Sequence, residues 1–223
     1  MRIIEVFNSI DGEGTRTGKL VTFIRTFSCN LRCSFCDTSY SYGENPYKEM
    51  HVDDVIEEVK KYSTKLVTLT GGEPLIHEDI DKLMSKLTLA GYEVNIETNG
   101  SVPLRQFFTF NHDYPLAMNN LIFTMDWKSP SSGMNDRMVH DNLFALRDTD
   151  VLKFVVGSKE DLDEMRKVVT ENHFRCKNIY LSPVWGKIEM SEIVDYMKEY
   201  DLNQCTIQMQ LHKIIWPVEM RGV

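Results

Sequence analysis

The chain has 223 residues, of which 42% are hydrophobic and 26% charged, with 12 Gly, 7 Pro and no biased tract. This is an ordinary globular composition, and the length favours a single core. Lys and Arg number 25 against 33 Asp and Glu, a formal net charge of −8, which argues against nucleic acid as a partner because polyanions bind basic surfaces. No apolar run approaches the roughly 18 residues of a membrane span and no signal peptide is evident, so we expect a soluble, cytoplasmic protein that does not bind membranes.

Short apolar runs rich in β-branched residues alternate with amphipathic patterns along the chain. The runs predict strands at 3–7, 20–26, 66–70, 93–97, 121–125, 151–156, 178–182 and 205–210. Helical spacing predicts helices at 52–62, 77–90, 158–171 and 191–200. Ser158 and Asp161 match a capping box, and the polar stretch 126–141 is predicted to be a functional loop.

Repeated strand–helix units of this spacing predict an α/β fold with a parallel sheet. Six or seven units are too few for a closed eight-stranded barrel, so we expect a partial (β/α) barrel of about six parallel strands. The near-continuous apolar character of the strands predicts a sheet buried on both faces. The expected organisation is one domain over 1–223.

Four polar motifs each follow a predicted strand directly. They are Cys29–Cys36, Gly71–Pro74, Glu97–Gly100 and Asp126–Lys128. Parallel α/β folds bind ligands at the carboxyl ends of their strands. We therefore expect the four motifs to converge on one rim of the sheet.

Three of the five cysteines, Cys29, Cys33 and Cys36, lie close together in the sequence FSCNLRCSFCDTSY. Clustered thiols without an export signal favour a metal or redox site in a reducing compartment. Zinc sites and ferredoxins normally use four ligands, whereas three thiolates leave one iron of a [4Fe–4S] cluster open for chemistry. A zinc site completed by a distant residue is the alternative. Cys176 and Cys205 lie in or beside apolar strands and are predicted to be buried and inert.

The C-x3-C-x2-C spacing after an early strand, followed one strand later by GGEP, resembles the radical S-adenosylmethionine enzymes. The resemblance implies a [4Fe–4S] cluster whose unique iron holds S-adenosylmethionine. Reductive cleavage of that cofactor gives a 5′-deoxyadenosyl radical that removes hydrogen from a substrate. Gly71 and Gly72 would let the backbone approach a ligand closely. Glu73 would accept from the ligand's amino group, and Phe35 would pack on its adenine.

Further motifs resemble one family of that class, the 7-carboxy-7-deazaguanine synthases. The shared stretches are Phe7–Gly14, Phe23–Arg25, CNLRCSFCDT, TGGEP, ETNGS and IQMQLHK. The family contracts 6-carboxy-5,6,7,8-tetrahydropterin to 7-carboxy-7-deazaguanine with loss of ammonia, in queuosine and 7-deazapurine biosynthesis. The resemblance implies a lyase with a small pterin substrate, a [4Fe–4S] cluster, S-adenosylmethionine and Mg²⁺. It also implies an electron donor such as flavodoxin or ferredoxin, and a homodimer.

The resemblance implies an N-terminal substrate-binding strand and a C-terminal closing tail, and it assigns roles position by position. The cluster ligands are Cys29, Cys33 and Cys36. Positions that match the S-adenosylmethionine site are Phe35, Asp37, Gly72, Glu73, Asn99, Asp126, Trp127, Lys128, Ser182, Pro183, Val184 and Trp185. Positions that match the substrate site are Ile10, Asp11, Gly12, Glu13, Arg25, Thr70 and His212, with Gln210 in the closing element and Thr38 as the Mg²⁺ ligand. The guanidinium of Arg25 suits a carboxylate because it forms two parallel hydrogen bonds.

Several of these positions have simpler explanations. A surface ion pair is the alternative for Arg25, a turn cap for Thr38 and full solvation for Lys128. Position 11 is Asp where many family members carry Gln, and the chain runs eleven residues past His212. Four other histidines are expected to be surface or structural: His77, His112, His140 and His173.

Two other functional classes remain open at this stage. A glycyl-radical activase of the same superfamily accounts for the cysteines and GGEP but not for Glu13, Arg25 and Thr38 together. A non-catalytic zinc or iron–sulfur module leaves the strand-end motifs unexplained.

Overall fold

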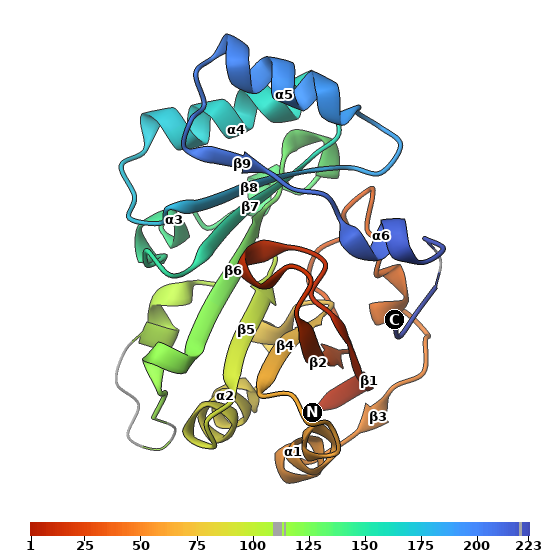
Figure 1. Ribbon diagram of the computed structural model, residues 1–223. Helices are drawn as coiled ribbons and strands as arrows, with labels where there is room; N and C mark the ends of the chain where they lie inside the picture. The colour runs from red at the N-terminus through yellow and green to blue at the C-terminus, as the bar shows by residue number, and fades with distance from the viewer. Residues whose placement is uncertain (109–112, 114, 219) are drawn as a thin grey trace.

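The computed structural model describes residues 1–108, 113, 115–218 and 220–223, so His112 lies outside the described part. A nine-stranded sheet runs through it in the order β3-β1-β2-β4-β5-β6-β7-β8-β9 (Figure 1). The strands are β1 Arg2–Ile10, β2 Leu20–Thr26, β3 Lys48–Glu49, β4 Leu66–Gly71, β5 Glu93–Thr98, β6 Leu121–Trp127, β7 Val151–Val156, β8 Asn178–Pro183 and β9 Cys205–Ile207. All eight predicted strands are present, although the last ends at Ile207 rather than at residue 210.

The sheet is largely parallel. In the described residues the seven strands β2 and β4–β9 run parallel, one more than the six expected. β1 is antiparallel to β2, and the two-residue β3 is antiparallel to β1, neither of which was predicted. β3 and β9 form the two edges, so the sheet is an open, partial barrel whose strand direction changes steadily from β4 to β9 (Figure 1).

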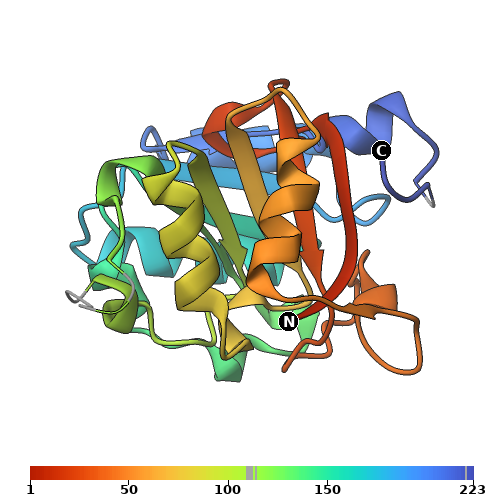
Figure 2. The same ribbon diagram turned by 90° about the horizontal axis from the view of Figure 1, so that it is seen from below.

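The helices are α1 Val52–Lys60, α2 Ile80–Leu89, α3 Asn142–Ala145, α4 Lys159–Glu171, α5 Met190–Glu199 and α6 Leu211–Ile215. The four longer helices are those predicted from apolar spacing, whereas α3 and α6 are too short to show a period. α1 and α2 lie side by side on one face of the sheet (Figure 2). Within the described residues, every helix is too short or too polar to span a bilayer.

The predicted capping box of α4 is only half formed. The Ser158 hydroxyl accepts from the Asp161 N–H at 3.3 Å. The Asp161 carboxylate accepts instead from the backbone N–H groups of Ser131 at 2.8 Å and Gly157 at 2.7 Å. Asp161 therefore ties the loop after β6 to the start of α4.

The two faces of the sheet differ in chemistry, because side chains alternate along each strand. The outer face buries apolar residues such as Ile24, Leu69, Ile96, Phe123 and Phe154 against the helices. The inner face carries the polar residues Arg25, Thr70, Glu97, Thr124, Asp126, Lys153 and Ser182, which the strand register places beside one another. Most of the inner-face residues are buried as well, so the sheet is buried on both faces as expected, but the inner face is polar rather than apolar.

Residues 11–19 fold into the amino end of the sheet interior. Arg16 is 3% exposed, and its Nε donates to Asp11 Oδ2 at 2.9 Å. Its terminal nitrogens donate to the carbonyl oxygens of Val67 at 3.0 Å and Glu93 at 3.1 Å, near the starts of β4 and β5. Arg16 thereby fills the space at the amino ends of β4 and β5 and hydrogen-bonds to backbone carbonyl groups there.

Candidate active site

The clustered cysteines lie in the segment that follows β2, residues 27–38, which is called the cysteine segment below. Cys29, Cys33 and Cys36 are free, partly exposed thiols. Burial raises the pKa of Cys33, and the neighbouring Cys36 and Cys29 raise it further, while Lys128 lowers it. Among the described residues no three His, Cys, Asp or Glu side chains converge closely enough to hold a single metal ion. In a cubane each thiolate binds a different iron, so this donor set fits a cluster better than one zinc ion.

Two glycines seat the cysteine segment on the end of β4. A Cβ at Gly71, whose φ is +133°, would overlap the Thr26 backbone, and one at Gly72 would overlap the Ser28 carbonyl group. The Gly72 N–H donates to the Thr26 carbonyl oxygen at 3.1 Å, and the Glu73 N–H to that of Ser28 at 2.9 Å. The structure therefore shows a different reason for these glycines from the predicted one: they admit the backbone of the cysteine segment.

The carboxylate of Glu73 joins two of the strand-end motifs. It is fully buried and accepts from the Leu75 N–H at 3.0 Å, the Thr98 hydroxyl at 2.9 Å and the Asn99 N–H at 2.6 Å. Burial raises the pKa of Glu73 to about 7 against the effect of these donors. All three contacts are made within the protein, so the structure shows a role in holding the GGEP turn to the turn after β5.

Asn99 connects that turn to the cysteine segment. Its Nδ2 lies 3.7 Å from Cys29 Sγ and 3.0 Å from Asn30 Oδ1. A Cβ on Gly100, in the same turn, would lie 3.3 Å from the Asp126 carbonyl oxygen. All four strand-end motifs therefore lie at one rim of the sheet, as expected for parallel strands.

A buried lysine in the middle of β7 links two carboxylates. Lys153 Nζ lies 3.1 Å from Glu13 Oε2 and 3.1 Å from Asp126 Oδ1, and Lys128 Nζ lies 3.0 Å from Asp126 Oδ2. The Ser182 hydroxyl also donates to Glu13, at 2.5 Å. Glu13, Lys153, Asp126 and Lys128 are called the ion chain below. Lys128 is paired and its side chain is 15% exposed, so the alternative of full solvation is wrong.

The ion chain holds its carboxylates ionised. Burial would raise the pKa of Glu13, but the Lys153 ammonium and the Ser182 hydroxyl outweigh it, and the pKa lies below its usual value. Burial would lower the pKa of Lys153, but Asp126 and Glu13 raise it well above the ordinary range. Sequence reasoning missed Lys153, although a lone charge inside the apolar run VLKFVV was an available signal.

Other predicted substrate residues line the inner face. The Thr70 hydroxyl donates to Glu97 Oε2 at 2.7 Å. Arg25 Nε donates to Glu5 Oε1 at 2.7 Å, and its guanidinium carbon lies 5.6 Å from the centre of the Tyr40 ring. The ion pair considered as the alternative for Arg25 is therefore present, on a side chain that remains 15% exposed.

Asp11, in the middle of the Ile10–Gly12 stretch, forms its side-chain contacts inside the fold. Its carboxylate accepts from Arg16 Nε and from the Thr68 hydroxyl, both at 2.9 Å. Burial raises the pKa of Asp11 to about 6, and Arg16 opposes that rise. The backbone of Gly12 packs so closely on the His212 ring that a Cβ there would overlap Nδ1.

The segment 208–213, called the closing segment below, binds both the N-terminal loop and the cysteine segment. Gln208 Nε2 donates to the Gly14 carbonyl oxygen at 3.1 Å and to Thr17 Oγ1 at 2.7 Å. Gln210 Nε2 donates to Glu13 Oε2 at 3.2 Å. The segment therefore contacts Glu13, and Gln208 makes contacts that the sequence did not reveal.

Lys213 fixes the closing segment to the cysteine segment. Its ammonium lies 3.1 Å from Asp37 Oδ2 and 2.8 Å from Gln210 Oε1. Partial desolvation would raise the pKa of Asp37, whose side chain is 50% exposed, but Lys213 and the Thr38 hydroxyl lower it to about 2. The Thr38 hydroxyl donates to Asp37 at 2.9 Å, which leaves the lone pairs of its oxygen as acceptors for a cation.

Three aromatic residues predicted to contact the cofactor differ in exposure. The Trp127 ring is buried in the core, 5.1 Å from the His140 ring and 6.5 Å from the Phe154 ring, on the opposite face of β6 from Asp126. Trp185, which follows Pro183 and Val184 after β8, is 50% exposed, and Phe35 is partly exposed. Trp185 and Phe35 are thus free to contact a ligand, whereas the Trp127 ring is not.

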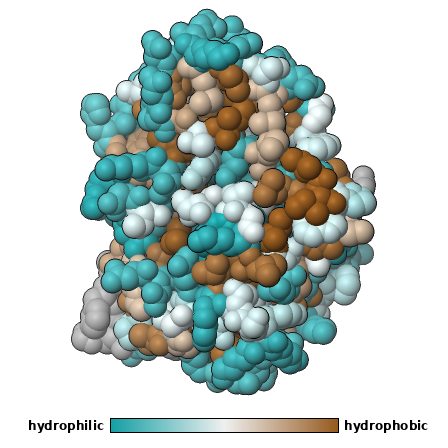
Figure 3. All heavy atoms as spheres, viewed as in Figure 1, coloured by the Kyte–Doolittle hydropathy of each residue, from teal (hydrophilic) through white to brown (hydrophobic). Residues whose placement is uncertain are grey.

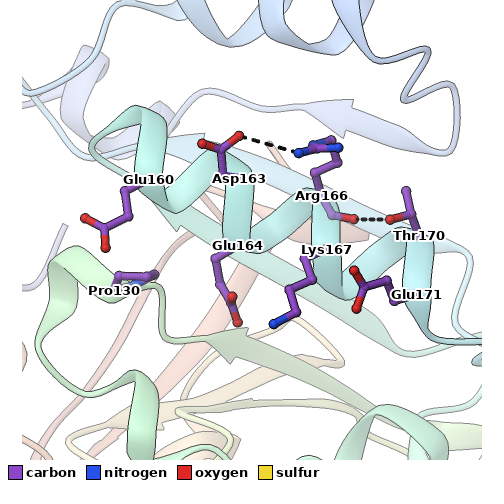
Figure 4. Close-up of a pocket in the computed structure, with 8 residues that line it drawn as sticks. All are labelled: Pro130, Glu160, Asp163, Glu164, Arg166, Lys167, Thr170 and Glu171. Atoms are coloured by element: carbon purple, nitrogen blue, oxygen red, sulfur yellow. Dashed lines mark hydrogen bonds and ion pairs between the residues drawn. The ribbon is translucent and has the colours of Figure 1, made fainter.

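A surface hollow of about 530 Å³ lies beside α4 (Figure 4). Its lining is mostly charged and consists of Pro130, from the loop after β6, and of the α4 residues Glu160, Asp163, Glu164, Arg166, Lys167, Thr170 and Glu171. Arg166 makes a 3.8 Å ion pair with Asp163. The hollow has the character of a solvated helix face.

A curved parallel sheet with a three-cysteine segment at its carboxyl edge is the architecture of a radical SAM protein, and a model of the Radical SAM superfamily matches residues 23–116. QueE from Escherichia coli has this fold, with a TM-score of 0.67 at 22% identity over 95% of this chain and 94% of that one. Streptococcus suis SuiB bound to S-adenosylmethionine gives a TM-score of 0.56 at 15% identity over 85% of this chain and 49% of that one. These likenesses confirm the predicted fold class.

Sequence relatives define the family more narrowly. The 7-carboxy-7-deazaguanine synthase of Clostridium acetobutylicum is 43% identical over 225 residues, spanning 100% of this chain and 99% of that protein. The Methanospirillum hungatei synthase is 37% identical over 96% of this chain and 85% of that protein. The Thermoplasma acidophilum synthase is 33% identical over 97% of each. The chain belongs to the 7-carboxy-7-deazaguanine synthase family, which confirms the resemblance and decides against the activase and the non-catalytic module.

Proposed function

We propose that this chain contracts 6-carboxy-5,6,7,8-tetrahydropterin to 7-carboxy-7-deazaguanine with loss of ammonia, using a [4Fe–4S] cluster, S-adenosylmethionine and Mg²⁺. The observation that carries the proposal is the ion chain, which brings Glu13 from the substrate motif and Asp126 from the cofactor motif together beside the cysteine segment. The full-length similarity to proteins named 7-carboxy-7-deazaguanine synthase supports the same reaction.

Cys29, Cys33 and Cys36 would hold the cluster, and three thiolates leave one iron for S-adenosylmethionine. When bound, the cluster and cofactor supply one-electron cleavage to a radical that removes hydrogen from the substrate. The chain's own residues hold the cofactor in place. We assign this task to Asn99 and to Phe35, whose partly exposed ring suits adenine, along with the other positions matched above: Asp37, Gly72, Glu73, Asp126, Lys128 and Ser182–Trp185. Trp127 would contact S-adenosylmethionine through its backbone atoms, because its ring is buried in the core.

The substrate carries a carboxylate at one end and pyrimidine N–H donors at the other. Glu13 is held ionised and is an acceptor for such donors, while the exposed part of the Arg25 guanidinium suits the carboxylate. Thr70, Ile10 and Gly12 would contact the ring, and His212 would cover it. Position 11 would contribute backbone atoms, since the Asp11 carboxylate bonds to Arg16.

Mg²⁺ would be bound by the Thr38 hydroxyl, together with oxygens of the substrate and of water. A hard cation takes oxygen ligands and usually keeps several waters. The partly exposed Thr38 hydroxyl, next to the ionised Asp37, supports this assignment. Binding a cation there would also neutralise the substrate carboxylate and fix its position, which matters because a radical reacts with the nearest hydrogen.

We propose a homodimer that receives electrons from flavodoxin or ferredoxin in the cytoplasm, with 1–223 as one domain. A hydrophobic patch over α6, visible in Figure 3, includes Ile214 and Ile215, which are 53% and 52% exposed, and supports a protein contact. The five cysteines are free thiols, which fits a reducing compartment. One sheet that includes strands from Arg2 to Ile207 supports a single domain.

The test is anaerobic reconstitution with iron and sulfide, followed by dithionite, S-adenosylmethionine, Mg²⁺ and the carboxytetrahydropterin, with products followed by mass spectrometry. Carboxydeazaguanine is the expected product. 5′-Deoxyadenosine without it would contradict the substrate assignment, and neither product from a protein with an intact cluster would contradict the enzymatic reaction itself.

Cysteine variants provide the matched control. Cys33→Ala is expected to fold but to lose the cluster and turnover. Cys176→Ala removes a buried thiol on the far side of the core and is expected to keep both. Normal product formation by Cys33→Ala would contradict the assignment of the cluster ligands.

A further inference from the structure

Lys153 is the one member of the ion chain to which neither the family motifs nor the proposed reaction assigns a task. Its ammonium lies 3.1 Å from an oxygen of Glu13, to which it donates a hydrogen bond, and 3.1 Å from Asp126 Oδ1, with which it forms an ion pair. The residue is only 6% exposed. Under the proposed function, Glu13 belongs to the substrate site and Asp126 to the S-adenosylmethionine site. Lys153 therefore stands between the two ligands.

The surroundings of Lys153 make its position sensitive to either carboxylate. Glu13 is also held by the Ser182 hydroxyl and the Gln210 amide, and Asp126 by Lys128. A ligand that orders Asp126 thereby orders Lys153, and Lys153 then orders Glu13. Binding of the first ligand carries the entropic cost of ordering the ion chain. The second ligand then meets groups that are already in place.

We propose that Lys153 is a positioning residue that couples the two ligand sites, so that each ligand binds more tightly when the other is present. This inference rests on the proposed function. Coupling between sites is reciprocal: the factor by which S-adenosylmethionine tightens substrate binding equals the factor by which substrate tightens cofactor binding. Lys153→Met removes the ammonium with little change in shape, and it should remove most of that factor.

The experiment measures equilibrium binding to the anaerobically reconstituted, unreduced enzyme, in which no turnover occurs. The Kd of 6-carboxytetrahydropterin is measured by calorimetry with and without S-adenosylmethionine, and the Kd of S-adenosylmethionine with and without the pterin. The wild-type ratio is expected to be about tenfold, within the roughly 5- to 150-fold range of such couplings. For Lys153→Met the ratio should fall to within about twofold of one.

Arg147→Met is the matched control. Arg147 Nη2 makes a 2.7 Å ion pair with Asp150, just before β7, and donates to the Leu121 carbonyl oxygen, while Nη1 donates to that of Met118. Its loss destabilises the same region of the sheet at the opposite end from the ligands, and the coupling ratio should stay at the wild-type value. An equal fall in both variants would mean that lost stability, rather than the ion chain, reduced the coupling, and would overturn the proposal.

Lys153→Arg addresses the case in which Lys153→Met fails to fold because Glu13 and Asp126 are left unpaired. Because the arginine keeps the positive charge, the logarithm of the coupling ratio should remain at least half of its wild-type value. A folded Lys153→Met with full coupling, or a folded Lys153→Arg with none, would overturn the proposal. If the wild-type enzyme makes carboxydeazaguanine and Lys153→Met keeps its coupling, only this inference fails. If the wild-type enzyme does not bind the pterin, the proposed function fails and the inference fails with it.

Discussion

Asp11 lies at a position that the family resemblance assigns to the substrate site, but its carboxylate is paired with Arg16 inside the fold. Breaking this pair tests whether the Asp11 side chain acts in stability or in substrate binding. Arg16→Met removes the partner of the Asp11 carboxylate and three further hydrogen bonds, to the Thr68 hydroxyl and to the carbonyl oxygens of Val67 and Glu93. Breaking a buried pair by removing one partner costs about 3–5 kcal/mol. For a domain of this size that corresponds to a fall in Tm of roughly 6–20 °C.

The loss should depend on pH. Burial raises the pKa of Asp11 to about 6, above its ordinary value of 3.8, and Arg16 limits that rise. Because the folded protein holds this proton more tightly than the unfolded chain, the free energy of unfolding falls as pH rises from about 4 to about 6. Without Arg16 the pKa of Asp11 lies higher still, so the fall continues above pH 6. The destabilisation by Arg16→Met should therefore be larger at pH 8 than at pH 5.

Urea denaturation at pH 5 and pH 8 measures both the loss of stability and its dependence on pH. Asp11→Asn in the Arg16→Met background is the control, because it should abolish the additional loss of stability above pH 6. A cost below about 1 kcal/mol, or one that is equal at the two pH values, would refute the reasoning. Asp11→Asn alone should leave the KM for the pterin within about twofold, because the carboxylate faces Arg16 rather than the ligand.

Three further variants probe the rim. Gly72→Ala forces the Ser28 carbonyl group aside, so we expect a loss of about 1–3 kcal/mol in urea denaturation together with a lower iron content; full iron occupancy would contradict this. Lys213→Met frees the closing segment from Asp37. Since the Asp37 side chain is 50% exposed, stability should change by less than about 1 kcal/mol while the KM for the pterin rises at least threefold. An unchanged KM would contradict a role of the closing segment in covering the substrate. Trp185→Ala, at a 50% exposed site, should leave Tm unchanged and weaken S-adenosylmethionine binding, as measured by calorimetry.

The sequence predicted the elements whose signal is local. Apolar spacing located α1 because Val52, Val55, Ile56 and Val59 form one buried face, and the strands were found because β-branched runs need no distant partner to be recognised. Strand direction was not predictable in this way: the pattern of β1 is that of any strand, and its antiparallel pairing follows from the short connection to β2. The two-residue β3 carries no pattern.

Within the site, the sequence indicated residue types but seldom their partners. It marked Gly72 correctly as a position without room for a side chain, yet the neighbour is the cysteine segment rather than a ligand. Lys153 was visible as a lone charge in an apolar strand, but Glu13 lies 140 positions away, and no local pattern connects the two. The same distance explains why Gln208 was missed, since its partner Gly14 is 194 positions away.

Those separations have a consequence for the order in which the contacts of the site can form during synthesis. Gln208 and Gln210 leave the ribosome long after the loop that they contact, since they lie 194 and 197 positions beyond their partners Gly14 and Glu13. Closing so long a loop is entropically costly and slow compared with local contacts. The sheet can therefore be assembled strand by strand while the nascent chain grows, but Glu13 gains its full set of partners only after Gln210 has been made. A chain that stops before the closing segment would carry Glu13 without its bond to Gln210 and Asp37 without its ion pair to Lys213.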